Sequence, residues 1–207
     1  MEEKISTKEK IIAASLELFS QRGYDGVSMR DIAAAVGIKG ASIYNHFKGK
    51  EAIFEAILEK MEQRYKEQAV GMQLDGAEAD RDVKVYAGIS EERLLQMGKN
   101  LFLYFLHDEY AGKFRKMLTI EQFRNEKLAS VYSRQYGDDP LAYQGMLFDL
   151  LMKQGELRQE NPKITALHFY APIYFMLSMC DRQPQREEEA LEMLEKHILQ
   201  FNRIYGK

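Results

Sequence analysis

The chain has few of the residues that build disulfide-rich or sharply bent proteins: one cysteine, four prolines and no tryptophan in 207 residues. The single cysteine, Cys180, excludes an internal disulfide, and we therefore expect a reducing compartment, the cytoplasm. No proline precedes Pro140, which permits long helices in the N-terminal half.

Long apolar runs are also lacking. The longest stretch without Lys, Arg, Asp or Glu covers residues 164–180, which is short for a membrane span. It predicts a helix that is buried in protein. The first four residues include charges and have no apolar run behind them, which argues against a secretory signal.

Neither sign of charge dominates, because 29 Lys and Arg stand against 32 Asp and Glu, a formal net charge of −3. This balance excludes a surface covered with nucleic acid, but it permits a local basic face. Between Ser28 and Lys50, four basic residues accompany a single acid, Asp31. Such a local excess of positive charge attracts phosphates.

Apolar residues recur at helical spacing along most of the chain, and no strand-like alternation or internal repeat is visible. The sequence therefore predicts an all-α fold. Acids and glycines break the periodicity at 70–89, where we expect a loop. Asp139-Pro140 and Asn161-Pro162 each have the pattern of an N-cap followed by proline in the first helical position. The expected helices begin at Ser6 and Ser28 and then cover about 41–47, 50–68, 90–105, 108–123, 125–136, 140–154, 162–180 and 185–205.

The segment from Ser28 to Glu51 has the pattern of a helix-turn-helix, two short helices joined by a tight turn around a small apolar core. Gly37 supplies the turn. The side chains expected at exposed positions of the second helix are small or can form hydrogen bonds, as a helix that enters the major groove of DNA requires. The expected core consists of Ile32, Ala33 and Val36 on one side and Ile38, Ile43 and Phe47 on the other.

Residues 37–51, GIKGASIYNHFKGKE, resemble the recognition helix and the start of the fourth helix of the TetR family of transcriptional regulators. Residues 19–33 are similar to the approach to that helix, with an aromatic residue after Gly23 and a hydroxyl residue at position 28. The resemblance implies a three-helix DNA-binding head at 1–50, a connecting fourth helix at about 50–68, and a helical-bundle ligand-binding and dimerisation domain at 51–207.

By this resemblance, Ser28, Tyr44 and Lys50 would contact the DNA backbone. Lys39, Ala41, Ser42 and Asn45 would approach base edges. Gly40 departs from the family, which usually has a polar or bulkier residue there. His46 is open between a phosphate contact and packing, and a plain helical hairpin would use Tyr44 to complete its core. The full set of expected DNA-binding residues is Ser28, Arg30, Lys39, Gly40, Ala41, Ser42, Tyr44, Asn45, His46, Lys48 and Lys50.

The second domain is rich in aromatic residues and methionines at helical spacing. These residues suit a helical core, but many large and adaptable side chains also suit a cavity for an apolar ligand. Pro172 should kink the 162–180 helix and could open room there. The candidate ligand-binding residues are Phe102, Tyr104, Phe105, Met117, Tyr143, Phe148, Met152, Phe169, Phe175 and Met176.

The last two helices predict a homodimer. The 164–180 run is too apolar for a surface helix, and the 185–205 helix has an apolar stripe opposite its acids. Pairing both helices with their symmetry mates would cover these faces and place two recognition helices on a palindromic operator. A small-molecule effector that prefers the DNA-free state would then release double-stranded DNA.

Other functions fit less well. The four histidines form no metal-spaced pair, and neither a phosphate-cradling glycine loop nor a nucleophile elbow is present in the sequence, so we expect no enzyme, metal or cofactor. A helical small-molecule-binding protein without DNA activity would leave the 28–50 pattern unexplained. The DNA-holding residues do not distinguish a repressor from an activator.

Overall fold

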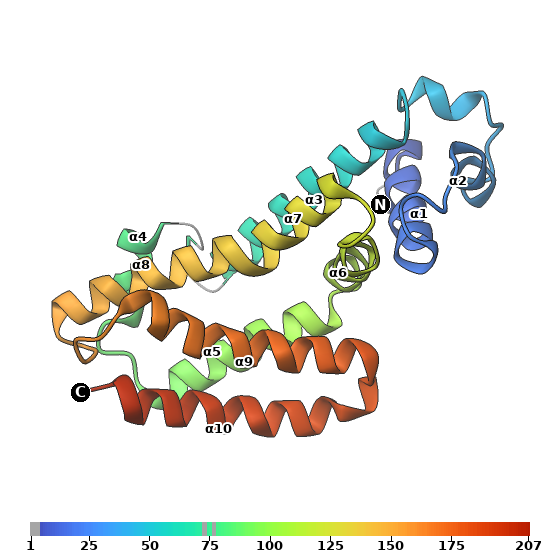
Figure 1. The fold of residues 1–207 in the computed structure, drawn as a ribbon. Coiled ribbons are helices and arrows are strands. Elements are labelled where there is room, and N and C mark those ends of the chain that lie inside the picture. The colour runs from blue at the N-terminus through green and yellow to red at the C-terminus, as the bar shows by residue number, and fades with distance from the viewer. Residues whose placement is uncertain (1–4, 72–73, 76–77) are drawn as a thin grey trace. The chain divides into compact units, whose positions relative to one another are not determined.

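The computed structural model describes residues 5–71, 74–75 and 78–207, and helices make up most of them (Figure 1). The only β feature among these residues is an isolated bridge between Leu157 and Gly206. The all-α prediction is confirmed. The elements are α1 (Thr7–Arg22), α2 (Met29–Val36), the 3-10 helix η1 (Ser42–Asn45), α3 (Lys50–Gly71), α4 (Ala79–Tyr86), α5 (Glu91–His107), α6 (Glu109–Glu121), α7 (Glu126–Ser133), the π-helical turn η2 (Arg134–Asp138), α8 (Asp139–Gln154), α9 (Pro162–Arg182), the 3-10 turn η3 (Pro184–Arg186) and α10 (Glu187–Tyr205).

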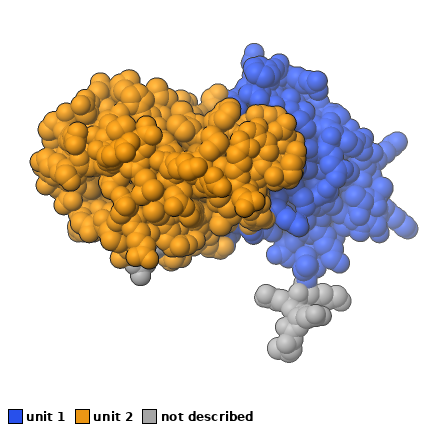
Figure 2. Space-filling view, turned by 90° about the horizontal axis from the view of Figure 1, so that it is seen from below, with its two compact units in different colours: residues 1–64, 109–132 blue, residues 65–108, 133–207 orange. Residues whose placement is uncertain are grey.

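The chain forms two compact units, residues 1–64 with 109–132 and residues 65–108 with 133–207 (Figure 2). This grouping differs from a division at residue 50, because α6 packs on α1 and the Tyr110 hydroxyl donates to the Ile57 carbonyl of α3 at 3.0 Å. Residues 109–132 therefore belong structurally with the N-terminal helices. The division by function at residue 50 stays a prediction.

Helix ends follow the local signals where these were clear. Ser6 and Glu9 form a complete capping box. The Ser90 hydroxyl accepts the Arg93 N–H, and the Asn161 side chain accepts the N–H groups of Lys163 and Ile164. Gly155 ends α8 in the left-handed conformation, with φ 82°. Side-chain acceptors and a glycine thus satisfy backbone groups that a helix end leaves open.

The loop expected at 70–89 is wrong for residues 79–86, which form α4; residues 72–73 and 76–77 lie outside the described residues. Val83 and Asp82 are buried, and Asp82 accepts the Tyr143 hydroxyl of α8 at 2.6 Å. An acid taken as a loop signal is instead a hydrogen-bonded core residue. The contact joins positions far apart in the sequence, so local periodicity did not reveal it.

The helix expected at about 140–154 is confirmed as α8, with Pro140 in its first turn, but the expected N-cap role of Asp139 is wrong. Asp139 has helical φ and ψ of −66° and −47° and makes no capping bond, and the chain passes from α7 to α8 through the π turn η2. Pro140 has no N–H to serve the carbonyl four residues earlier. That carbonyl, of Tyr136, accepts the Tyr170 hydroxyl at 3.0 Å. A hydrogen bond from α9 therefore lets the helical path continue.

The second unit has two clusters of buried residues. One lies mainly between α4, α8 and α9, and the other between α5, α9 and α10, with Phe169 packed against both. Near Pro172 of α9, the Phe169 carbonyl lies 2.9 Å from His197 Nε2 of α10. That nitrogen must carry the proton, so a side chain supports the backbone beside the proline. No helix in the described ranges is long and apolar enough to cross a membrane.

Candidate nucleic-acid interface

The head, residues 5–57, has a small core formed by α1, α2, η1 and the first half of α3. Ile32 and Ala33 of α2 are buried against it, as are Ile43 and Phe47 around η1, while Val36 and Ile38 are half-buried. The predicted helix-turn-helix core is confirmed. The other buried residues of the head are Ile11, Ile12, Ser15, Leu16, Phe19, Gly23, Val27, Ile53, Phe54 and Ile57.

The start of α2 is fixed by a capping box. The Ser28 hydroxyl accepts the Asp31 N–H at 3.2 Å and donates to the Asp31 carboxylate at 2.7 Å, and the Ser28 N–H donates to the same carboxylate at 2.8 Å. These bonds lower the pKa of the Asp31 carboxyl, with a smaller contribution from Arg22, whose guanidinium lies 3.6 Å away. The first-turn N–H groups of Met29 and Arg30 remain available to a phosphate.

The turn after α2 uses Gly37 in the left-handed conformation, with φ 76° and ψ 30°. The recognition element is shorter than the expected 41–47 helix, since η1 spans Ser42–Asn45 and is a 3-10 helix. Ala41 precedes it and offers no side-chain cap. With Gly40 just before, the segment lacks a favourable helix start, which accounts for the single turn.

Side chains in η1 and the two residues after it divide between the core and solvent. Ile43 and Phe47 are buried, whereas Tyr44 between them is 56% exposed. Tyr44 therefore does not complete the core. Ser42 is half-buried, and the expected contact residues that are exposed are Ser28, Arg30, Lys39, Gly40, Ala41, Tyr44, Asn45, His46 and Lys48.

Lys50 differs from these residues because its ammonium is already occupied. It donates to the carbonyls of Tyr24 at 2.7 Å and Val27 at 3.0 Å, and it lies 4.3 Å from the centre of the Tyr24 ring. The side chain is half-buried. Its first role is therefore to hold the turn between α1 and α2, which sequence reasoning did not indicate.

Glu121, at the end of α6, holds the same turn from another helix. It is 2% exposed, and one carboxyl oxygen accepts the Tyr24 N–H at 2.8 Å. A Cβ on Gly23 would lie 2.4 Å from that oxygen, so the close approach requires glycine. Gly23 was predictable as a helix end, but its partner 98 positions later had no local signal.

The candidate ligand-binding residues are distributed over both units and over two buried clusters, with Phe169 packed against both clusters. Met117 is buried in the first unit, while the other nine belong to the second. Phe148 and Met152 lie in one buried cluster, and Phe102 and Met176 in the other. Tyr104 and Phe105 have ring centres 5.3 Å apart, and Phe175 is 57% exposed.

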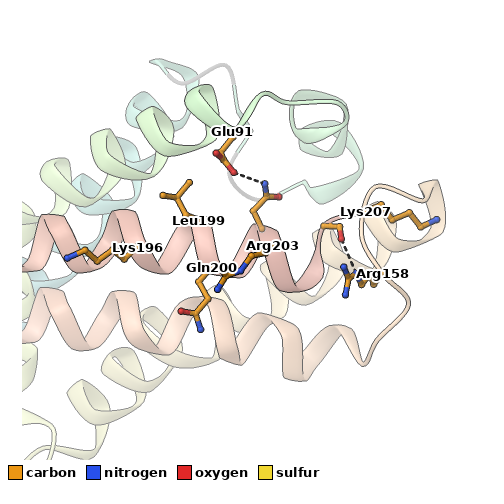
Figure 3. Close-up of a pocket in the computed structure, with 9 residues that line it drawn as sticks. Glu91, Arg158, Lys196, Leu199, Gln200, Arg203 and Lys207 are labelled. Atoms are coloured by element: carbon orange, nitrogen blue, oxygen red, sulfur yellow. Dashed lines mark hydrogen bonds between the residues drawn. The ribbon is translucent and has the colours of Figure 1, made fainter.

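One surface hollow of about 640 Å³ has a different lining (Figure 3). It lies along the C-terminal half of α10, near the start of α5, and includes Arg158 from the segment after α8. None of the ten candidate ligand residues lines it. Its lining residues are Glu91, Arg158, Lys196, Leu199, Gln200, Asn202, Arg203, Gly206 and Lys207.

Comparison with known proteins points to one family. Residues 11–57 match the model of a protein family described as "Bacterial regulatory proteins, tetR family". YttP of Bacillus subtilis, whose name describes it as an HTH-type transcriptional regulator, is 28% identical over 98% of this chain and 89% of its own length. IcaR of Staphylococcus aureus, a negative regulator of a biofilm operon, is 52% identical over 48 residues, which are 23% of this chain and 26% of IcaR.

Solved structures support the same fold along nearly the whole chain. A protein from Mesorhizobium loti assigned to the TetR family matches with a TM-score of 0.68 and 21% identity, over 97% of each chain. SmeT, the repressor of a multidrug efflux pump of Stenotrophomonas maltophilia, matches in its triclosan complex with a TM-score of 0.66 and 21% identity, over 97% of this chain and 92% of SmeT. The head thus has the helix-turn-helix geometry of the DNA-binding segment that the TetR family model describes, and the chain as a whole has the fold of the solved TetR-family regulators.

Proposed function

We propose that this protein is a repressor that binds a palindromic operator as a homodimer and that a small, largely apolar effector releases it. The observation that carries the proposal is the surface of the head, where Tyr44, Asn45 and Lys48 face outward over a core of Ile43 and Phe47. Two likenesses support the finer points: IcaR is a negative regulator, and SmeT has been crystallised with triclosan.

DNA contacts divide into two kinds. Tyr44, Lys48 and the first-turn amides of α2 would hold phosphates, which fixes position without reading sequence. Lys39, Ala41, Ser42 and Asn45 would approach base edges in the major groove. Gly40 has no side chain and so reads no base itself, but it lets the backbone approach closely.

Selection of bound sequences from random duplexes, followed by binding measured at several salt concentrations, tests this proposal. Lys48→Gln, which removes a proposed phosphate contact, should weaken binding and flatten its dependence on salt, whereas the matched control Lys84→Gln, an exposed lysine of α4, should change neither. Wild-type protein that prefers no sequence at moderate salt would contradict the proposal and favour a helical binding protein without DNA activity.

The sign of regulation needs its own measurement, since an activator would hold DNA with the same residues. Transcription in vitro from a promoter that contains the selected operator should fall when the protein is added, and triclosan, as a first apolar probe, should restore it if the effector site resembles that of SmeT. Transcription that rises on addition of the protein would make it an activator.

Homodimerisation is supported by an apolar line on α9 that no other element of the described chain covers. Ile164, Leu167, Ala171 and Phe175 are exposed and follow one another at spacings of three and four, so they share one face of the helix. An exposed apolar face of this kind marks an interaction surface. Sedimentation that gives a monomer at micromolar concentration would contradict the dimer.

Release of DNA would follow from a population shift, in which the effector binds the DNA-free arrangement of the helices more tightly. The turn at Tyr24 supplies a physical link inside the first unit, because Lys50 of α3 and Glu121 of α6 both hold it. A displacement of either helix therefore acts on the start of α2. Effector and operator must weaken each other's binding by the same factor, which titration of each in the presence of the other measures.

A further inference from the structure

The exposed charges of α10 change sign along one face of the helix. Glu188, Glu192, Lys196 and Arg203 are all exposed, and spacings of four, four and seven residues place them on the same face. Acids occupy the N-terminal half of this face and bases the C-terminal half. The basic half lines the hollow in Figure 3, together with Arg158 and Lys207.

The helix dipole explains part of this arrangement, because acids favour the first turn of a helix and bases the last. That effect fades within one turn, whereas Glu192 and Lys196 lie in the middle of α10, where they pair at 3.2 Å. Arg158 donates to the Gly206 carbonyl at 3.1 Å, and Glu91 contacts Asn202. The hollow thus contains more positive charge than its single acid, Glu91, can balance.

We propose that this basic half binds the acidic half of α10 from a second copy of the chain, with the two helices antiparallel. This rests on the proposed homodimer and specifies its register. The apolar stripe of α10, which the sequence suggested for the dimer interface, is instead buried within its own unit, as Leu194 and Ile198 show, so the charged face is the one left for a second copy.

A two-fold axis beside the turn from Lys196 to Gln200 would bring Glu192 to Arg203 of the second copy. The same axis brings exposed Met193 to Ile204 of the second copy. One register therefore matches charge with charge and apolar surface with apolar surface, as a self-complementary interface requires.

Charge reversals test the register, with sedimentation equilibrium as the measurement. Glu192→Lys and Arg203→Glu should each weaken self-association roughly tenfold or more, because each places like charges together twice in the dimer. An equimolar mixture of the two variants should associate nearly as tightly as wild type, since both unlike pairs form. The double variant, with the charges exchanged, should also self-associate. Asp149→Lys and Lys153→Glu reverse an exposed pair on α8 and serve as matched controls that leave association unchanged.

Each other outcome overturns a distinct claim. A monomeric wild type removes the dimer of the proposed function and this register with it. A wild-type dimer that is insensitive to both reversals, or a mixture no tighter than its components, overturns the register alone. Calorimetry with inorganic phosphate adds a further check: saturable binding that Arg203→Glu abolishes while association is unchanged would assign the hollow to a small anion instead.

Discussion

The head and the second unit use the same kinds of apolar residue, but they differ in the sequence distance between the residues that decide each structure. In the head, the capping box of Ser28 and Asp31, the turn at Gly37 and the buried Ile43 all lie within sixteen residues. In the second unit, Asp82 bonds to Tyr143 and Phe148 packs on Phe201. Short-range patterns are therefore sufficient for the first region and insufficient for the second.

The largest effect expected from this comparison is at Phe148. Its ring is 7% exposed and lies 5.6 Å from the Phe169 ring and 5.5 Å from the Phe201 ring. Phe148→Ala should lower the free energy of unfolding by about 4 kcal/mol, because it leaves a cavity in a packed cluster. Phe175→Ala, at an exposed position, should cost under about 0.5 kcal/mol in protein dilute enough to be monomeric. Urea denaturation measures both, and a small loss at Phe148 would favour a ligand cavity over a core.

Neighbouring residues of η1 should separate stability from DNA binding. Ile43→Ala should cost about 3 kcal/mol of unfolding free energy, since Ile43 is fully buried. Tyr44→Ala should leave stability within about 0.5 kcal/mol of wild type and yet weaken operator binding. Thermal unfolding and a binding titration on the same samples make the comparison. If Tyr44→Ala unfolded the head, its outward role would be wrong.

The next largest change in stability is expected from replacing a glycine. Gly23 has φ 76° and faces the Glu121 carboxyl, so Gly23→Ala should destabilise by about 2 kcal/mol through strain and crowding. Gly49 has open space around its Cα, and Gly49→Ala should change stability little. Urea denaturation of the pair measures the cost. Equal stabilities would show that α6 does not hold the turn this closely in solution.

The smallest effect is expected at the start of α2. Ser28→Ala should cost about 1 kcal/mol, as the loss of an N-cap usually does. The pKa of Asp31 is lowered from its ordinary value of 3.8 by these bonds, so its contribution is present above that pH and is lost as the pH falls through the lowered pKa. Wild type should therefore lose more stability than Asp31→Asn between pH 5 and pH 3. Parallel curves for the two proteins would contradict the capping role.

The sequence was sufficient to predict the fold class, the helix-turn-helix core and the exposure of most expected DNA-contact residues. Each of these features depends on periodicity, helix caps or a turn glycine. It did not reveal the contacts of Lys50 within the head, and it was wrong about α4. The ammonium of Lys50 donates to two carbonyls of a preceding turn, and its expected contact with DNA stays a prediction. Acids at 75–82 suggested a loop, but α8 supplies a hydrogen-bond partner for the buried Asp82. In both places a polar group has a partner that lies elsewhere in the chain.

The residues expected to bind a ligand also depend on tertiary contacts that the sequence does not reveal. Phe148 and Met176 have the residue types of an adaptable pocket, and types alone do not distinguish a pocket from a filled core. Their placement in two buried clusters, with Met117 in the other unit, depends on tertiary packing. Helical spacing predicted that they face inward, but could not predict what they face.

The double attachment of Tyr24 has a consequence for cooperativity within the first unit. Its N–H is bound to Glu121 and its carbonyl to Lys50, so a movement of α3 that α6 does not follow must break a hydrogen bond to a charged group. Such a bond contributes roughly 1.5–3 kcal/mol, which makes intermediate arrangements rare. The two helices should therefore shift in a concerted, switch-like step, and the head should occupy two discrete orientations instead of a continuous range.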